Sequence, residues 1–587
     1  MNQLRQALRA HGLDAYIIPT SDPHQSEYVA EHWKGRQWIS GFSGSAGIVV
    51  ITQDHAGLWT DSRYFLQADN QLDGSEFVLH KQHATGTPEH VTWLAEHLPK
   101  GSTVGIDGYL FSVGQLRHLE KHLQPKGIDI NTKIDLIAEI WKDRPVLPLE
   151  PIFEYDVTYA GESRADKLKR IREKMIKQGA DFHLITTLDD IAWALNIRGK
   201  DVEANPVAIS YLVVGKEMAY LFINAVKVPD HIKTNLNNDG VIIKSYDAIE
   251  SFLQKLETPI LVDDRSISVR LYEAIPEGQI IKGDNITLLL KSIKNPTEIS
   301  HLREAMRKDG VALLRFFRWL EQELKTRTVT EFEAGRKLDE FRAVQGNYFG
   351  ESFTAIVGYN ANGAIVHYRP EEGSSAEIKS EGILLLDSGG QYLEGTTDIT
   401  RTIALGTPTE EQKRHYTLVL KGHIALAKAK FPTGTTGVQL DTLARQFLWQ
   451  QGLNFGHGTG HGVGFFLNVH EPPQGFTASP NNQRGSTPHE PGMLTSNEPG
   501  FYKTGEYGIR IENLVLCVEA EENDFGKFLQ FDTLTLFLID TTLIDSNLLT
   551  QEEKNWFNEY QHRVFNELAP RLDGEEVEWL RRKCDEI

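Results

Sequence analysis

The sequence predicts an α/β (α+β) fold class, with two related domains ahead of a larger third domain. The junction at residues 12–14 (GLD) recurs at residues 179–181 (GAD), each time after a basic amphipathic helix and before apolar, strand-like runs. Residues 143–151 (DRPVLPLEP) are proline-rich and so interrupt both helices and central strands. From residue 296 onward, long helices alternate with strands rich in Gly, Thr and β-branched residues.

The first two domains are predicted at residues 1–148 and 149–294. An internal duplication would explain their likeness. The alternative is that helix-to-strand junctions look alike in any α/β protein, so the repeat by itself leaves both explanations open.

The third domain is predicted at residues 295–587, and helix-capping patterns mark several of its helices. Asn295 reads as an N-cap, followed by a proline at the first helical position and by Glu298, which completes a capping box. Thr550 and Glu553 form a similar box before the first of two terminal helices. The predicted long helices run over residues 296–325, 409–430 and 437–451.

Composition excludes several functional classes. The chain has 587 residues, and 81 acidic against 61 basic residues give a net charge of −20, which would repel a nucleic acid backbone. The N-terminus lacks the apolar core of about 7 residues that a signal peptide needs, and no apolar run reaches the ~20 residues that span a bilayer. Only two cysteines are present, which fits a reducing compartment. We expect a cytoplasmic protein that contacts no membrane.

Two aspartates stand out in residues 383–405 (ILLLDSGGQYLEGTTDITRTIAL). An apolar strand is expected to end at Asp387, Ser388 to Gly390 to form a turn, and the returning strand to carry Asp398. Burying such an aspartate costs free energy unless a cation or a hydrogen-bond donor satisfies it. A solvated hairpin end is the alternative interpretation of this pair taken alone.

Three histidines, His457, His461 and His470, lie in residues 457–473 (HGTGHGVGFFLNVHEPP). Small residues between them let the backbone come close to whatever the imidazoles bind. The glycines recur at every second residue, so there is no G-x-G-x-x-G register and a nucleotide-binding loop is a poor interpretation.

Two further segments carry acidic residues. Glu498 stands just before a Pro-Gly turn, and residues 508–516 (GIRIENLVL) read as one strand in which Arg510 and Glu512 share a face. An arginine beside a carboxylate on an apolar strand suggests a fixed pair that holds a ligand in place. A simple surface ion pair is the alternative for this strand in isolation.

Together these segments supply four carboxylates and one imidazole. Four negative ligands would offset the charge of two divalent cations, and such oxygen-rich sets suit hard to borderline metals. The absence of cysteine ligands argues against a structural zinc site. The predicted ligands are Asp387, Asp398, His461, Glu498 and Glu512.

These residues resemble those of the pita-bread metallopeptidases (family M24), the fold shared by methionine aminopeptidase, prolidase and aminopeptidase P. In that family the ligands follow in the order Asp, Asp, His, Glu, Glu, and all five positions are filled here. The long, three-domain aminopeptidases P are the most similar group, because the likeness covers essentially the whole chain. Matching motifs include HQSEYVAEHW, LWTDSRYFLQA and LDDIAWALNIRGKDVEANPV in the first two domains and GAIVHY, TTDITRT, HGTGHGVG, LNVHEPP, NEPGFY and GIRIEN in the third.

The resemblance implies two creatinase-like α/β domains followed by a pita-bread catalytic domain. It also implies a metal-dependent Xaa-Pro aminopeptidase, which releases the residue in front of a proline through a hydroxide that bridges two divalent metals. Manganese is the expected metal, with zinc or cobalt possible. The expected partners are peptides with N-terminal Xaa-Pro and a second copy of the chain in a homodimer.

The resemblance assigns roles to individual residues as well. Asp387 and Asp398 would hold one metal, Asp398 and Glu512 would bridge to the second, and His461 and Glu498 would complete it. Glu498 would also shuttle a proton. His367 and His470 would be catalytic and contact the substrate. His457, near the proline pocket, and Tyr502 would also contact the substrate, and Arg510 would support the ligands.

Three other hypotheses compete with this one. A prolidase would cleave Xaa-Pro dipeptides, but prolidases resemble this chain over only one N-terminal domain and the catalytic domain. A creatinase-like enzyme works without metal and replaces the ligands. A peptide-binding protein on the same fold loses ligands and gains acidic tails. Residues 476–491 (FTASPNNQRGSTPHEP) match the family least well and are expected to form a mobile surface loop near the site.

Overall fold

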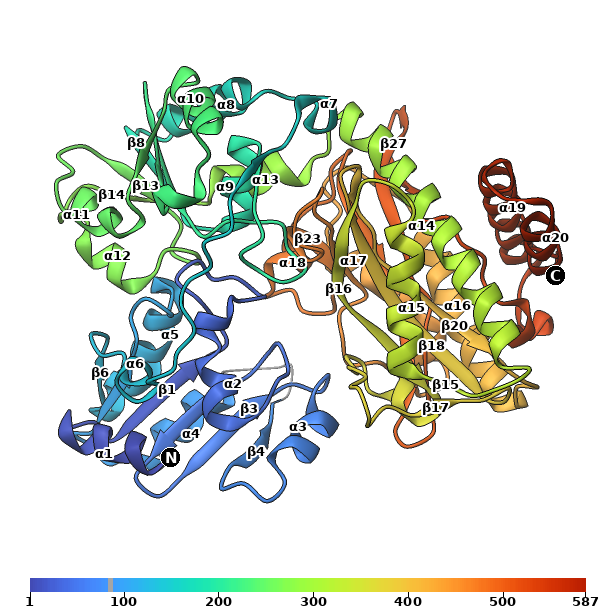
Figure 1. Cartoon of the computed structure of the whole chain (residues 1–587), viewed down its shortest axis with the longest axis horizontal. Coiled ribbons are helices and arrows are strands. Elements are labelled where there is room, and N and C mark those ends of the chain that lie inside the picture. The colour runs from blue at the N-terminus through green and yellow to red at the C-terminus, as the bar shows by residue number, and fades with distance from the viewer. Residues whose placement is uncertain (83–87) are drawn as a thin grey trace. The chain divides into compact units, whose positions relative to one another are not determined.

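The computed structural model describes residues 1–82 and 88–587, and it divides into two compact units, Met1–Leu288 and Leu289–Ile587 (Figure 1). Within the described residues, no helix is long and apolar enough to cross a membrane. Both cysteines, Cys517 and Cys584, are buried free thiols.

The first unit contains two six-stranded mixed sheets, coloured blue and green in Figure 1. The order of the first sheet is β4-β3-β2-β1-β5-β6. Its central strand β1 pairs antiparallel with β2 and parallel with β5. Its strands are β1 (Ala15–Pro19), β2 (Ile48–Thr52), β3 (Ala56–Thr60), β4 (Val78–Lys81), β5 (Thr103–Ile106) and β6 (Asp129–Asn131).

The second sheet repeats the first in order and direction. Its order is β12-β11-β10-β8-β13-β14, and its central strand β8 again pairs antiparallel with one neighbour and parallel with the other. Its strands are β8 (Phe182–Ile185), β10 (Tyr211–Gly215), β11 (Ala219–Phe222), β12 (Val241–Lys244), β13 (Ile260–Val262) and β14 (Ile280–Lys282).

Helices also precede the two central strands in the same way. Helix α1 (Asn2–Ala10) leads into β1, and α8 (Arg164–Lys177) leads into β8. The prediction of two related α/β domains is therefore confirmed, and duplication explains the repeat better than a chance likeness of junctions. The boundaries at residues 148 and 294 stay a prediction.

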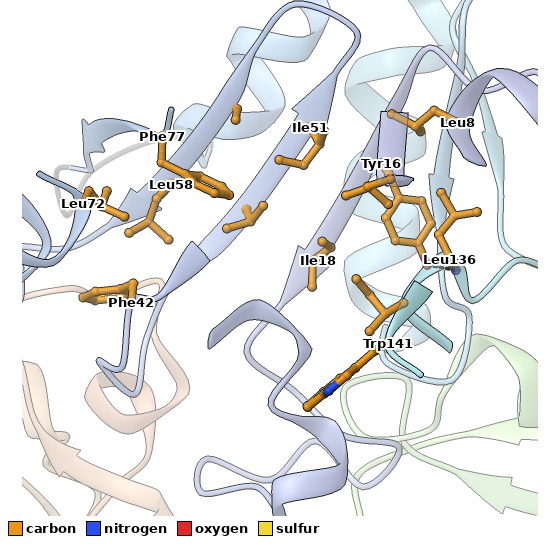
Figure 2. Packing of buried hydrophobic residues seen from close by; sticks show 14 of the residues in the cluster. Leu8, Tyr16, Ile18, Phe42, Ile51, Leu58, Leu72, Phe77, Leu136 and Trp141 are labelled. Atoms are coloured by element: carbon orange, nitrogen blue, oxygen red, sulfur yellow. Dashed lines mark hydrogen bonds between the residues drawn. The ribbon is translucent and has the colours of Figure 1, made fainter. Parts of the chain in front are cut away.

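The core of the first sheet shows why β1 is apolar at every position. Tyr16 and Ile18 face one side with Leu8 of α1 (Figure 2). Ala15 and Ile17 face the other side, where they belong to a second core cluster. A central strand covered on both faces must be apolar throughout, which is why the run AYIIP lacks alternation.

The second unit is built on two sheets. The long antiparallel strands β16 (Tyr348–Tyr359) and β18 (Ile383–Tyr392) form the first sheet with β19 (Gly395–Thr396) and β20 (Ile399–Ala404). The second sheet has the order β21-β28-β27-β24-β22-β23. Its strands are β21 (Lys430–Pro432), β22 (Gly460–Gly462), β23 (Glu471–Phe476), β24 (Leu494–Asn497), β27 (Asn513–Asn523) and β28 (Gly526–Thr533).

A hairpin and several long helices complete this unit. The hairpin joins β25 (Gly500–Lys503) to β26 (Tyr507–Arg510). Helix α15 runs beside β16, α14 packs against α15, and the terminal helices α19 and α20 pack against α14 (Figure 1). The long helices are α14 (Pro296–Glu323), α15 (Glu331–Ala343), α16 (Glu410–Ala427), α17 (Gly437–Trp449), α19 (Gln551–Leu568) and α20 (Gly574–Lys583).

The helix starts predicted from capping patterns are confirmed. Asn295 and Glu298 form the expected capping box of α14, with proline at its first turn, and Thr550 and Glu553 form that of α19. The predicted ends of α14, α16 and α17 lie two or three residues beyond the observed ends. Such differences are ordinary because helix ends fray.

Two details of the predicted strands are wrong. Ser388 to Gly390 do not form a turn, because β18 continues through them as far as Tyr392 and pairs with β16. Gly389 serves a close approach instead: a Cβ there would lie 2.0 Å from the Thr397 carbonyl oxygen. Residues 508–516 are not one strand either, because pairing with β25 ends at Arg510, pairing with β24 begins at Asn513 and pairing with β28 begins at Val515.

Residues 476–491 lie largely at the surface, as expected, and their mobility stays a prediction. They contain the short helix α18 (Gln483–Ser486), which contacts α17 and β23. His489 is fully buried and stacks on Phe476 at a ring distance of 4.8 Å. His489 therefore anchors the end of this polar segment among the rings of Phe431, Phe476 and Phe531.

Candidate metal centre

Asp387 and Asp398 come from adjacent strands of the first sheet. Asp387 lies in the middle of β18, directly opposite Thr400 of β20. Asp398 precedes β20 and stands two residues before Thr400, so its side chain shares the face of Thr400. Both aspartates are buried. Strand pairing, not the expected turn, therefore brings the two carboxylates to one place.

His461 lies on β22 with one ring nitrogen turned toward these acids. Its Nδ1 lies 2.9 Å from the Gly462 carbonyl oxygen, which can only accept, so Nδ1 carries the proton. Nε2 then presents its lone pair, 3.5 Å from Asp398 Oδ2 and 3.4 Å from Glu498 Oε1. A donor bond from the far nitrogen is the usual way in which proteins orient a metal-binding histidine.

The two glutamates approach from loops at strand ends. Glu498 follows β24 and accepts a hydrogen bond from Ser496 Oγ at 3.1 Å. Glu512 lies where the chain passes from β26 to β27, and its Oε2 accepts a hydrogen bond from Thr400 Oγ1 at 2.8 Å. One potential ligand atom each from Asp398, His461 and Glu512 lies within 4.8 Å of the others.

Arg510 joins several of these groups from behind. Its Nη2 donates to Asp387 Oδ2 at 2.6 Å, its Nη1 donates to the Tyr502 hydroxyl at 2.7 Å, and its Nε donates to Thr400 Oγ1 at 3.1 Å. The guanidinium is buried, so these bonds hold it in one position. The predicted pairing of Arg510 with Glu512 is not direct, because the guanidinium bonds Asp387 and reaches Glu512 through Thr400.

Burial, followed by repulsion between like charges, sets the electrostatics of the acids. Burial, together with the charges of Glu512, Asp387 and Glu498, raises the pKa of Asp398 well above its ordinary value. Burial, with Glu498 and Asp387 nearby, does the same to the pKa of Glu512. Burial also raises the pKa of Glu498 to about 7, against the opposing effect of Arg510.

These residues fit divalent cations. Asp387 Oδ1 is buried and has no hydrogen-bond partner among the described residues, although Oδ2 is held by Arg510. An unsatisfied carboxylate oxygen beside other crowded carboxylates costs free energy unless a cation is bound there. Oxygen and imidazole donors with no thiolate are the set that such ions prefer in catalytic sites.

The residues expected to meet the substrate surround this cluster. The His470 ring stands edge-on to His461 at 4.2 Å. His457 Nε2 lies 2.7 Å from the Tyr502 hydroxyl, which is itself held by Arg510. His367 lies in the turn after Val366, whose carbonyl oxygen accepts a bond of 3.4 Å from Arg510 Nη2.

Two hydroxyl residues at the site were not predicted. Thr400 bonds both Glu512 and Arg510, and Ser496 bonds both the His461 amide and Glu498. The run TTDITRT does contain a signal for Thr400. Asp398 and Thr400 are two residues apart, and residues with that spacing on a strand share a face. Ser496 has the same two-residue spacing from Glu498.

Comparison with known families agrees with this arrangement. The model for metallopeptidase family M24 matches residues 300–519, and the C-terminal region of peptidase M24 matches residues 527–587. Two models for the creatinase/prolidase N-terminal domain match residues 1–140 and 143–298.

Similar proteins span the full chain. A probable Xaa-Pro aminopeptidase P of Laccaria bicolor is 42% identical over 603 residues, covering 100% of this chain and 93% of the relative. The X-prolyl aminopeptidase of Caenorhabditis elegans, described as a cytosolic enzyme with a di-nuclear active site, has a TM-score of 0.95 and 36% identity, covering 100% and 99% of the two chains. An Xaa-Pro dipeptidase of Bacillus anthracis shares the fold, with a TM-score of 0.52 and 24% identity over 64% of this chain and 99% of its own.

The fold, the cluster of acids and the family matches together define a metallopeptidase, a hydrolase of peptide bonds. The chain belongs to metallopeptidase family M24. Its predicted resemblance to the long, three-domain aminopeptidases P is confirmed by relatives that match it from end to end.

Proposed function

We propose that this protein is an Xaa-Pro aminopeptidase whose active site holds two divalent metal ions. The observation that carries the proposal is the convergence of Asp398, His461 and Glu512, with Glu498 and Asp387 beside them. Full-length relatives named as Xaa-Pro aminopeptidases, and a similar structure described as di-nuclear, support it.

The charge of the site supports two ions. Four carboxylates gather there, and Arg510 is already paired with Asp387. Because Arg510 offsets one of the four negative charges, two divalent ions together with one hydroxide would make the site neutral. We infer that Asp387 and Asp398 hold one ion, that Asp398 and Glu512 reach the second, and that His461 and Glu498 complete it. Manganese suits this oxygen-rich set, and zinc and cobalt are the alternatives.

The residues then divide the work of hydrolysis. When bound, the two ions would lower the pKa of a water shared between them and so supply a hydroxide as nucleophile at neutral pH. Glu498 accepts a proton from the attacking water and delivers it to the leaving nitrogen. His367 and His470 donate hydrogen bonds to the oxyanion that develops on the scissile carbonyl.

Selectivity for proline follows from the substrate. A bond to proline has a tertiary amide nitrogen without N–H, so the enzyme cannot recognise a donor there and must fit the ring instead. We assign this contact to His457 and Tyr502, because the hydrogen bond between them and the bond from Arg510 fix both rings beside the acids.

We also propose that the protein acts in the cytoplasm as a homodimer on peptides with N-terminal Xaa-Pro, and that it binds neither membranes nor nucleic acid. The description of the C. elegans relative as cytosolic and the net charge of −20 support the compartment and the exclusion of nucleic acid. Light scattering of the purified protein tests the dimer, which a mass near 66.3 kDa would contradict.

A peptide assay tests the activity. The purified protein is incubated with Arg-Pro-Pro and with Arg-Ala-Ala, before and after treatment with a chelator and after Mn²⁺ is restored. We expect arginine to be released from Arg-Pro-Pro alone, with activity lost on chelation and recovered with Mn²⁺. Asp398→Asn is expected to be inactive in every condition.

Two outcomes would contradict the proposal. Cleavage of Arg-Pro with no cleavage of Arg-Pro-Pro would indicate a dipeptidase, as in prolidases. No cleavage of either tripeptide with Mn²⁺, Zn²⁺ or Co²⁺ would favour a peptide-binding protein instead.

A further inference from the structure

Glu331 is a buried carboxylate outside the metal centre. It is the first residue of α15 and its side chain is 0% exposed. An acid at the start of a helix is usually explained by the positive end of the helix dipole and points into solvent. Glu331 instead points inward, so its position calls for a different explanation.

The carboxylate accepts hydrogen bonds from four groups of one chain segment. Oε1 accepts from the Tyr359 amide at 2.7 Å and from Asn362 Nδ2 at 3.0 Å. Oε2 accepts from the Tyr368 hydroxyl at 2.7 Å and from the Ala376 amide at 2.8 Å. Such charge-assisted bonds offset the cost of burying the charge.

Those four donors define a loop, residues 359–376, that leaves β16 and returns toward β17 (Glu377–Ile378). Tyr359 and Ala376 are its two ends, so a single carboxylate closes its neck. Asn362 and Tyr368 bind from within the loop. His367 is the neighbour of Tyr368 and lies between these two inner contacts.

The same loop also rests on the strand that carries Arg510. Arg510 Nη2 donates to the Val366 carbonyl oxygen at 3.4 Å. Gly508 of β26 lies against Gly363, so closely that a Cβ on Gly508 would be 1.7 Å from the Gly363 carbonyl oxygen. The loop is therefore held both by Glu331 and by β26.

We propose that Glu331 is a positioning residue for catalysis, which fixes the loop of residues 359–376 so that His367 meets the scissile carbonyl. This inference rests on the proposed function, since it gives His367 its role there. Glu331 itself touches neither the substrate nor the metal ligands. Loss of its contacts would leave the ligands in place and displace the histidine.

Glu331→Gln is the variant that tests this. A glutamine has the same size, but an amide nitrogen replaces one of the two carboxylate oxygens. That nitrogen cannot accept a hydrogen bond, so the donors that bonded the replaced oxygen lose their acceptor. A displacement of about 1 Å is enough to cost about 100-fold in rate. We expect kcat and kcat/KM for Arg-Pro-Pro to fall together by about 10- to 100-fold, with bound Mn²⁺ unchanged.

A double-mutant cycle separates positioning from general weakening. If Glu331 acts through His367, Glu331→Gln combined with His367→Ala is no slower than His367→Ala alone. If the two changes multiply, Glu331 is merely structural and the inference is wrong. Tyr368→Phe, which removes one donor and keeps the carboxylate, is expected to give a smaller loss and guards against misfolding of the glutamine variant.

Hydrogen exchange gives a readout that needs no activity. Amides within residues 359–376 are expected to exchange faster in Glu331→Gln than in the wild-type protein. Glu576→Gln is the matched control, because Glu576 is a buried glutamate of the same unit that pairs with Arg315 and belongs to the capping box of α20. It should leave the exchange of residues 359–376 unchanged. Unchanged exchange in Glu331→Gln overturns this inference, whereas failure of the wild-type protein to cleave Arg-Pro-Pro overturns the proposed function.

Discussion

Thr400→Val removes one hydroxyl from the centre of the site and leaves the shape of the strand intact. Thr400 is fully buried, and its Oγ1 donates to Glu512 Oε2 at 2.8 Å while it accepts from Arg510 Nε at 3.1 Å. Hydrogen bonds to charged groups contribute about 1.5–3 kcal/mol each. Loss of the bond to Glu512 then predicts a fall of about 10- to 100-fold in metal affinity, which agrees with the usual effect of removing a residue that orients a ligand.

The assay is a titration of activity against free Mn²⁺ after complete removal of metal, with bound metal measured in parallel. We expect the midpoint for Thr400→Val to move upward by that factor, and kcat at saturating Mn²⁺ to fall less. Thr402→Val is the matched control. Thr402 lies two residues along the same strand, is equally buried, and bonds the backbone of Arg510 instead of a carboxylate. Equal midpoints for both variants, or no shift for Thr400→Val, would refute the reasoning.

Three further predictions concern stability. Glu471 pairs with both Lys291 and Lys294 in the interior, so Glu471→Gln leaves two buried ammonium groups uncompensated. The free energy of unfolding, measured with urea, should fall by about 3–5 kcal/mol, which is more than for Lys291→Met. Thr550→Ala removes the N-cap of α19, so it should lower the free energy of unfolding by about 1 kcal/mol and lower the melting midpoint. An unchanged melting midpoint would contradict this prediction. Burial lowers the pKa of His489 to about 4 from 6.5, so the unfolded chain binds its proton first. The contribution of His489 to the free energy of unfolding is therefore fully present above pH 6.5 and should fall by up to about 3 kcal/mol as the pH drops to 4. A His489→Phe variant whose free energy of unfolding falls equally steeply with pH would contradict this.

The sequence predicted those features that depend on residues close together in the chain. The capping boxes of α14 and α19 join residues only three apart, so a four-residue pattern contains all the relevant interactions. The repeated sheets of the first unit were visible for a similar reason, because each copy carries its own helix-to-strand junction.

The arrangement of the site was only partly predictable. The sequence selected the acids and histidines by type, but it placed the turn at Ser388 and joined Arg510 to Asn513 in one strand. Both errors arise from pairing with distant segments. Pairing with β16 keeps β18 extended past Ser388, and the hydrogen bond from the Glu512 amide to the Thr400 carbonyl oxygen takes the chain out of the hairpin. Local alternation cannot reveal which strand a segment will pair with.

Glu331 shows the same limit in its most complete form. Nothing around it in the chain distinguishes it from an ordinary acid at a helix start, and its four donors lie in a different segment, from Tyr359 to Ala376. Only the fold reveals that a single buried charge satisfies both ends of that loop. The buried carboxylate loses its hydrogen bonds to water, and hydrogen bonds from this loop replace them. The folding of the loop is therefore coupled to the folding of the start of α15. The same dependence applies at the metal centre, where Thr400 ties Glu512 and Arg510 to one strand, so the residues that the sequence does not single out decide where the recognisable ones stand.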